Sequence, residues 1–122
     1  MFIEAYGLYT YPDAVVVCGD IERTDAKTET ITNPLLIIEV LSPTTAAYDR
    51  SKKFDRYRSL ESFCEYILIL QDRPFIEHYR KNESDEWLIR FIYGFEAIVS
   101  FDSFEFELPL HSIYEYVEWD EN

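Results

Sequence analysis

The sequence predicts a single α/β domain whose sheet contains both parallel and antiparallel strands. The chain has 122 residues, close to the commonest length of one domain, and 48% of them are hydrophobic. Between residues 34 and 70 an apolar strand, a helix and a second apolar strand follow one another, an order that implies a parallel pair. From residue 75 onward, short apolar segments separated by turns indicate antiparallel hairpins.

Two apolar segments flank a long polar one in the first part of the chain. The β-branched run from Ala14 to Cys18 indicates a buried strand. Residues 19–33 are largely polar and acidic, and we expect a loop whose length is unusual for a plain hairpin and typical of a functional or mobile segment. From Pro34 to Leu41 the apolar residues are nearly continuous, which predicts a strand covered on both faces.

A helix is expected from Asp49 to Leu60. Within it Phe54, Tyr57 and Leu60 follow one another at three-residue spacing, so they form a narrow apolar stripe among charged residues. A third buried strand should run from Tyr66 to Leu70. The helix therefore connects two strands of the same sheet.

The remaining elements are predicted from alternation and from turn residues. Alternation in the segment that begins at residue 75 predicts a strand with one solvated face. Pro109 is expected to open a short helix, because proline is favoured in the first helical turn. The expected strands are Phe75 to Arg80, Trp87 to Tyr93, Ala97 to Phe101 and Phe104 to Leu108, and the helix is Pro109 to Tyr116.

Composition narrows the classes of function. The formal net charge is −13, which weighs against nonspecific binding to nucleic acid because such binding requires Lys and Arg to displace counterions from phosphate. The most basic stretch covers residues 49–58, and any contact with phosphate is expected there. No secretory signal and no apolar run of about 20 residues is present, so we expect a soluble, cytoplasmic protein without a membrane partner. Cys18 and Cys64 are expected to be reduced core thiols.

Two acidic residues stand out because each lies at or inside an apolar run. Asp13 precedes AVVVC, and Glu39 lies within PLLIIEVL. A buried carboxylate is costly unless it is paired or binds a metal. If the two strands pair antiparallel with Cys18 opposite Pro34, Asp13 lies opposite Glu39 with Cβ atoms about 5 Å apart. Both carboxylates could then bind one Mg²⁺ ion, which prefers oxygen ligands.

A structural interpretation of the same residues stays open. Asp13 could cap a strand end, and Glu39 could form an ion pair with Arg or Lys of the helix. Lys53 lies on the first turns of the expected helix, where it could reach the two acids, but a solvated lysine is the alternative. His78 and His111 lie on different elements without the spacing of metal ligands, so both are expected to be structural.

The order and spacing of four segments resemble the Uma-two family of restriction endonucleases, within the PD-(D/E)XK nuclease superfamily. The segments are YPDAVVVC, NPLLIIEVLSPTT, YDRSKKFDRYRSL and EYILILQDRPFIEHYR. The resemblance implies a restriction-endonuclease-like mixed sheet with flanking helices and antiparallel C-terminal hairpins. It also implies hydrolysis of DNA phosphodiester bonds with Mg²⁺ or Mn²⁺.

The resemblance assigns roles to three residues. Asp13 and Glu39 become the metal ligands and catalytic acids. The superfamily usually has lysine two residues after the second acid, and Leu41 occupies that position here. Lys53, in the pattern DR-x-x-K, takes the catalytic role instead, and Lys52 is a less favoured substitute.

The beginning of the chain departs from the family. Members usually have several dozen residues before the PD strand, whereas twelve precede Asp13 here. The resemblance thus predicts one nuclease domain over residues 1–122 that lacks its N-terminal helix and first strand. A weak or inactive nuclease is expected, with homo-oligomers formed through the exposed sheet edge. The alternative is a noncatalytic remnant that acts as a protein-interaction module.

Overall fold

A five-stranded mixed sheet forms the centre of the molecule. The computed structural model describes residues 1–20 and 31–115. The strand order is β3-β4-β5-β6-β7, and β4 and β5 are parallel while the other neighbours are antiparallel. The strands are β3 (Ala14–Val16), β4 (Leu36–Leu41), β5 (Glu65–Leu70), β6 (Phe75–Lys81) and β7 (Trp87–Tyr93). The predicted α/β class, mixed sheet and parallel pair are therefore confirmed.

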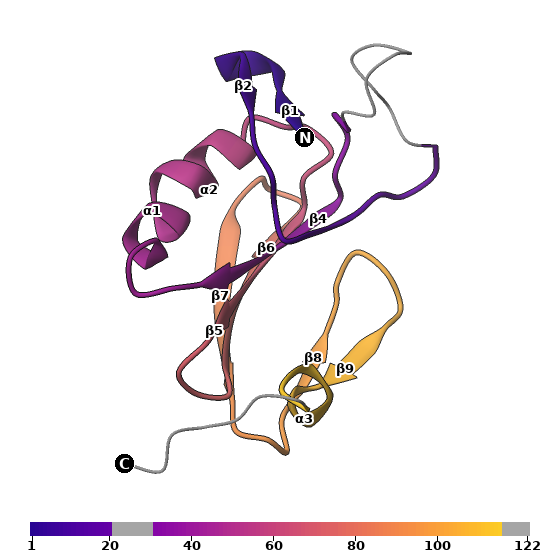
Figure 1. Ribbon diagram of the computed structural model, residues 1–122. Coiled ribbons are helices and arrows are strands. Elements are labelled where there is room, and N and C mark those ends of the chain that lie inside the picture. Colours follow the sequence, from indigo (N-terminus) through magenta and orange to yellow (C-terminus); the bar gives the residue numbers. More distant parts are fainter. Residues whose placement is uncertain (21–30, 116–122) are drawn as a thin grey trace.

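Different layers cover the two faces of this sheet (Figure 1). Helices α1 (Ala46–Arg50) and α2 (Lys52–Tyr57) lie on one face. A hairpin of β8 (Ile98–Ser100) and β9 (Glu107–Pro109), followed by α3 (Leu110–Ile113), lies on the other. At the N-terminus a small hairpin is formed by β1 (Phe2–Ile3) and β2 (Leu8–Tyr9), which flank the 3₁₀ helix η1 (Glu4–Tyr6). None of the described helices is long and apolar enough to cross a membrane.

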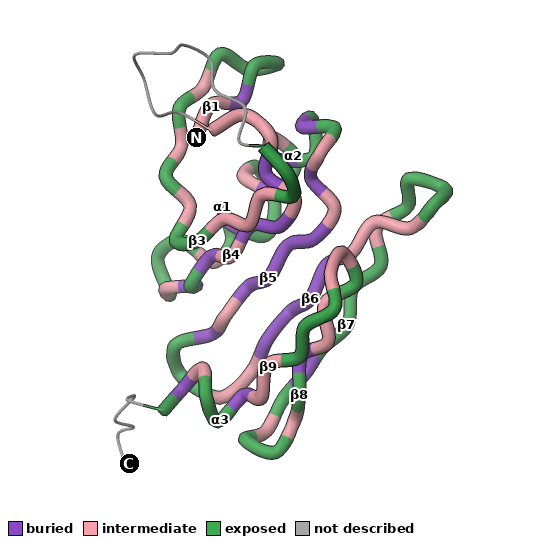
Figure 2. Tube along the Cα trace, turned by 90° about the vertical axis from the view of Figure 1, so that its right-hand side faces the viewer, coloured by how far each residue is buried: buried purple, intermediate pink, exposed green. Residues whose placement is uncertain are grey.

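Each face has its own hydrophobic core. Aromatic side chains dominate the helix side, where Phe54 and Tyr57 of α2 pack on Phe63, Tyr66 and Tyr79. The hairpin side is mostly aliphatic: its buried residues are Leu36, Ile67, Ile76, Ile92, Val99, Leu110 and Tyr114. Figure 2 shows the buried stretches along β5 and β6, whereas β7 is largely exposed.

The expected continuous helix from Asp49 to Leu60 is wrong in its bounds. The chain instead forms α1 and α2, which meet at Ser51 with φ −118° and ψ −90°. The Ser51 hydroxyl donates a 2.6 Å hydrogen bond to the Ala47 carbonyl, one turn earlier. A serine that bonds back in this way competes with helical hydrogen bonding and bends the backbone.

Other expected bounds also change. The strand expected from Ala14 to Cys18 is β3, which ends at Val16. Cys18 is exposed rather than part of the core, and Cys18 and Cys64 are both free thiols. The C-terminal hairpin is shorter than expected because residues 101–106 form a loop, closed by a 3.1 Å bond from the Phe101 amide to the Phe106 carbonyl. The last helix is also shorter than expected, because α3 runs from Leu110 to Ile113 and Pro109 still belongs to β9. Most of the expected loop at 19–33 lies outside the described residues.

Candidate functional site

The pairing of β3 with β4 brings Asp13 to Glu39. Ala14 pairs with Ile38 and Val16 with Leu36, which is the register expected from the sequence. One residue further, the Asp13 amide donates a 3.0 Å hydrogen bond to Oε1 of Glu39. The Val40 amide in turn donates a 2.7 Å bond to Oδ2 of Asp13. These reciprocal bonds hold the two acidic residues together at the sheet edge.

Lys53 reaches the same point from α2. Its Nζ atom forms an ion pair with Oε2 of Glu39 and lies 3.3 Å from Oδ1 of Asp49. Glu39 and Asp49 are both buried, and Lys53 is mostly buried, whereas the neighbouring Lys52 is exposed. The structure therefore places Lys53, not Lys52, against the acids.

Asp49 is the residue of this site that sequence reasoning missed. It lies on α1, and only its four-residue spacing from Lys53 indicated that the two share a face. Its Oδ1 atom is buried and has no hydrogen-bond partner among the described residues, although it lies within ion-pair distance of Lys53. A carboxylate oxygen held in this way is ready to accept a further ligand.

Burial and pairing change the acidities at this point. Burial raises the pKa of the Glu39 carboxyl above its ordinary value, although the hydrogen bonds from Lys53 and from the Asp13 amide oppose the rise. Burial by itself would lower the pKa of Lys53, but its hydrogen bond to Glu39 and the negative charges around it together raise the pKa. Lys53 therefore stays protonated. Burial raises the pKa of nearby Tyr57 to about 12, and this tyrosine belongs to the core, as expected.

The donor set fits a hard divalent cation. The carboxyl groups of Glu39 and Asp49 contact the Lys53 ammonium group, and Asp13 adds a third carboxyl group beside Glu39. Ionised, these side chains together have a net charge of two negative units, and every anionic donor among them is an oxygen, which is the ligand type that Mg²⁺ and Mn²⁺ prefer. The same contacts also satisfy a purely structural ion pair, so the roles of the three predicted site residues stay predictions.

Basic residues continue from this site toward the carboxyl ends of the parallel strands. Arg50 of α1 binds Glu77 of β6 through Nε and Nη2, with Nη2 2.5 Å from Oε2. Arg50 and Arg73 both line an open cavity of about 450 Å³ beside the ends of β4 and β5. In open α/β sheets, ligands commonly bind at the carboxyl ends of the strands.

Comparison with known proteins identifies the family. Residues 3–111 match the Uma2 family, whose description is "Putative restriction endonuclease". This chain belongs to the Uma2 family. The resemblance found in the four sequence segments is thereby confirmed, and most of the chain lies within the match.

Two relatives and one solved structure extend the comparison. The chain is 39% identical over 93 residues to one uncharacterized protein of Synechocystis sp. and 42% identical over 81 residues to another. These matches cover 76% and 66% of this chain but 52% and 42% of the relatives, so the chain spans about half the length of the curated relatives it matches. The crystal structure of "a putative nuclease belonging to DUF820" from Anabaena variabilis superposes with a TM-score of 0.56 at 19% identity, covering 72% of this chain and 48% of that one. This likeness confirms the nuclease-like fold.

A second polar cluster was not expected from the sequence. His78 is not isolated: its Nε2 atom lies 2.6 Å from Oε2 of Glu65, and both side chains are buried. Hydrogen bonds from His78 and Ser103 overcome the effect of burial and lower the pKa of Glu65. No local pattern links residues 65 and 78, because they meet only through the pairing of β5 with β6. His111, on α3, is exposed.

Proposed function

We propose that this chain carries the catalytic centre of a metal-dependent DNA endonuclease, in which Asp13 and Glu39 bind Mg²⁺ or Mn²⁺. The observation that carries the proposal is that the Glu39 carboxylate contacts both the Asp13 amide, through the β3–β4 register, and the Lys53 ammonium group of α2. Membership of the Uma2 family supports it. When bound, the cation would polarise the phosphate and lower the pKa of an attacking water.

The protein's own groups have separate tasks in this proposal. The Asp13–Glu39 pair supplies fixed carboxylate oxygens, because each residue is held by a backbone amide of the neighbouring strand. Lys53, kept protonated, would stabilise the negative charge that develops on the phosphate. Arg50 and Arg73 line the cavity beside the ends of β4 and β5. They could hold a phosphate of the DNA backbone despite the acidic net charge of the protein.

Plasmid nicking in the presence of Mg²⁺, Mn²⁺ or EDTA tests the proposed activity. We expect slow nicking that requires the cation, because the acidic net charge of the protein repels DNA. Binding of Mn²⁺ is measured in parallel by calorimetry, so that metal binding is scored independently of turnover. Nicking that persists in EDTA, or the absence of any Mn²⁺ binding, would contradict the proposal.

Lys53→Ala is expected to lower the rate of nicking about 100- to 1,000-fold, the typical cost of removing one group that stabilises transition-state charge. The matched control is Lys52→Ala, because Lys52 is exposed on the same helix. Circular dichroism checks that both variants fold. Equal activity of the two variants would show that Lys53 has only a structural role.

The alternative proposal is a protein-interaction module that binds a second copy of the chain. It is favoured by a group of exposed apolar side chains on β7, at one edge of the sheet: Ile89, Phe91 and Tyr93. These residues alternate with others along the strand, so they share one face. The opposite edge strand, β3, has only three residues and offers less surface.

Sedimentation over a range of concentrations tests this alternative. Phe91→Glu is expected to weaken self-association at least about tenfold, because it places a charge in the centre of an apolar contact. Phe106→Glu is the control, since Phe106 is equally exposed but lies between β8 and β9, on the other face. A wild-type chain that stays monomeric at every concentration would exclude the interaction.

A further inference from the structure

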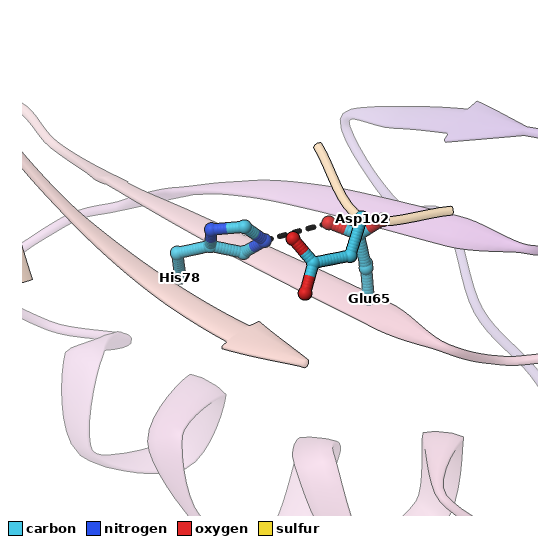
Figure 3. Close-up of side chains that lie close together, drawn as sticks. All are labelled: Glu65, His78 and Asp102. Carbon is cyan, nitrogen blue, oxygen red and sulfur yellow. Dashed lines mark hydrogen bonds and ion pairs between the residues drawn. The ribbon is translucent and has the colours of Figure 1, made fainter. Parts of the chain in front are cut away.

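Three ligand-type side chains from distant parts of the chain converge on the hairpin face of the sheet (Figure 3). Glu65 lies on β5, His78 on β6 and Asp102 in the loop between β8 and β9. Each offers one ligand atom, and these atoms all lie within 4.8 Å of one another. His78 pairs with Ile67, a residue of the hairpin-side core, so this cluster lies on the face opposite Glu39 and Lys53.

The side chains of Glu65 and His78 are held by hydrogen bonds before any ion binds. Oε1 of Glu65 accepts hydrogen bonds from both the amide and the hydroxyl of Ser103, and Oε2 contacts Nε2 of His78. Nδ1 of His78 is buried and has no hydrogen-bond partner among the described residues, so the ring's polar contact is made through Nε2. Nε2 of His78, the ring nitrogen that faces the carboxylates, is therefore held in place by its contact with Glu65.

Burial makes this arrangement costly unless its charge is compensated. The side chains of Glu65 and His78 are 1% and 0% exposed. Asp102 differs, because 42% of its side chain is exposed and it forms a 2.8 Å ion pair with Arg80. The cluster thus has a rigid buried part and one ligand at the surface, through which an ion can enter.

We propose that Glu65, His78 and Asp102 form a zinc site that fastens the β8–β9 loop to the sheet. One imidazole nitrogen with two carboxylate oxygens is a donor set that Zn²⁺ accepts and Mg²⁺ does not favour. Ligands about 2 Å from zinc lie roughly 3–3.5 Å apart, so small side-chain movements within the cluster suffice. Zinc would bind the lone pair of Nε2 of a neutral His78 ring that carries its proton on Nδ1, and it would replace Arg80 as the partner of Asp102.

This zinc site is independent of the proposed nuclease centre. It lies on the other face of the sheet and contains nitrogen, whereas the Asp13–Glu39 site contains only oxygen donors. Its function would be structural, because the ion links a loop residue to β5 and β6. Zinc at about 100 times its dissociation constant is expected to raise Tm by about 5 °C or more.

Calorimetric titration of the full chain with Zn²⁺ tests the proposal, and Co²⁺ absorption reports the ligand environment. Asp102→Asn removes the surface ligand without disturbing the buried pair and should weaken Zn²⁺ binding at least about tenfold. Asp85→Asn is the matched control, since Asp85 is an exposed acid in the β6–β7 turn. Glu39→Gln should leave this binding unchanged, so failure here is distinguishable from failure of the nuclease centre.

Arg80→Gln separates a zinc site from a simple salt-bridge network. If Asp102 is a zinc ligand, removal of the competing Arg80 charge should tighten Zn²⁺ binding about threefold or more, and the Tm in zinc should not fall. If the cluster is only a network of ion pairs, the same substitution weakens it and zinc has no effect. Unchanged zinc affinity in Asp102→Asn, or weaker zinc binding in Arg80→Gln, would overturn the proposal.

Discussion

Glu39→Gln is expected to abolish the binding of Mn²⁺ at the Asp13–Glu39 site and to lower cation-dependent nicking more than about 100-fold. Changing a residue that only supports a metal ligand costs about 10- to 100-fold, and the loss of a ligand itself should cost more. The substitution keeps the size of the side chain but removes the charge that faces Lys53 and the Asp13 amide. Calorimetry with Mn²⁺ and nicking of supercoiled plasmid measure the two effects.

Three companion variants make this result specific. Glu83→Gln changes an exposed acid in the β6–β7 turn and should leave both readouts unchanged. Asp102→Asn disrupts the cluster on the other face and should keep Mn²⁺ binding at the first site. Asp13→Asn should reproduce the loss seen with Glu39→Gln. If both Asp13→Asn and Glu39→Gln bind Mn²⁺ as the wild type does, the pair is structural.

Phe63→Ala is expected to lower the free energy of unfolding by about 3–5 kcal/mol. The Phe63 side chain is completely buried between α2 and the sheet, with its ring centroid 5.9 Å from Tyr57, 5.8 Å from Tyr66 and 5.1 Å from Trp87. A cavity at this point removes contacts on several sides at once, since the rings around it cannot all move inward. Urea unfolding followed by fluorescence measures the loss.

Phe63→Ala should also have an indirect effect on Mn²⁺ binding at the Asp13–Glu39 site. Phe63 packs against α2, the helix that carries Lys53. Under conditions in which the variant is partly unfolded, its Mn²⁺ binding should therefore be weaker. Phe106→Ala is the control, because this phenylalanine is exposed and its removal should cost less than about 1 kcal/mol. A loss at Phe63 no larger than at Phe106 would mean that the aromatic core tolerates the cavity.

The sequence was sufficient to locate the strands of the central sheet and to select the three residues of the proposed nuclease centre. Strand positions follow from runs of apolar residues, which are local, and the expected β3–β4 register is the one observed. Asp13 and Glu39 could be found because an acid in an apolar run is visible without any knowledge of the fold. Lys53 was identified by its position in the motif and by its place on a helix that follows the Glu39 strand.

The other features of the two sites depend on contacts between residues that lie far apart in the chain. Asp49 could be recognised as part of the site only after α1 and α2 packed against β4, and the break at Ser51 depends on a hydroxyl-to-carbonyl bond that propensity does not predict. The cluster on the other face was equally hidden: Glu65 meets His78 through the β5–β6 register, and Asp102 joins them through the path of a loop. The periodicity of apolar residues predicts which face of a strand or helix a side chain occupies. Whether side chains from different elements meet depends on which strands pair, in which register, and on the path of the loops. These contacts join residues far apart in the chain, so no local pattern predicts them.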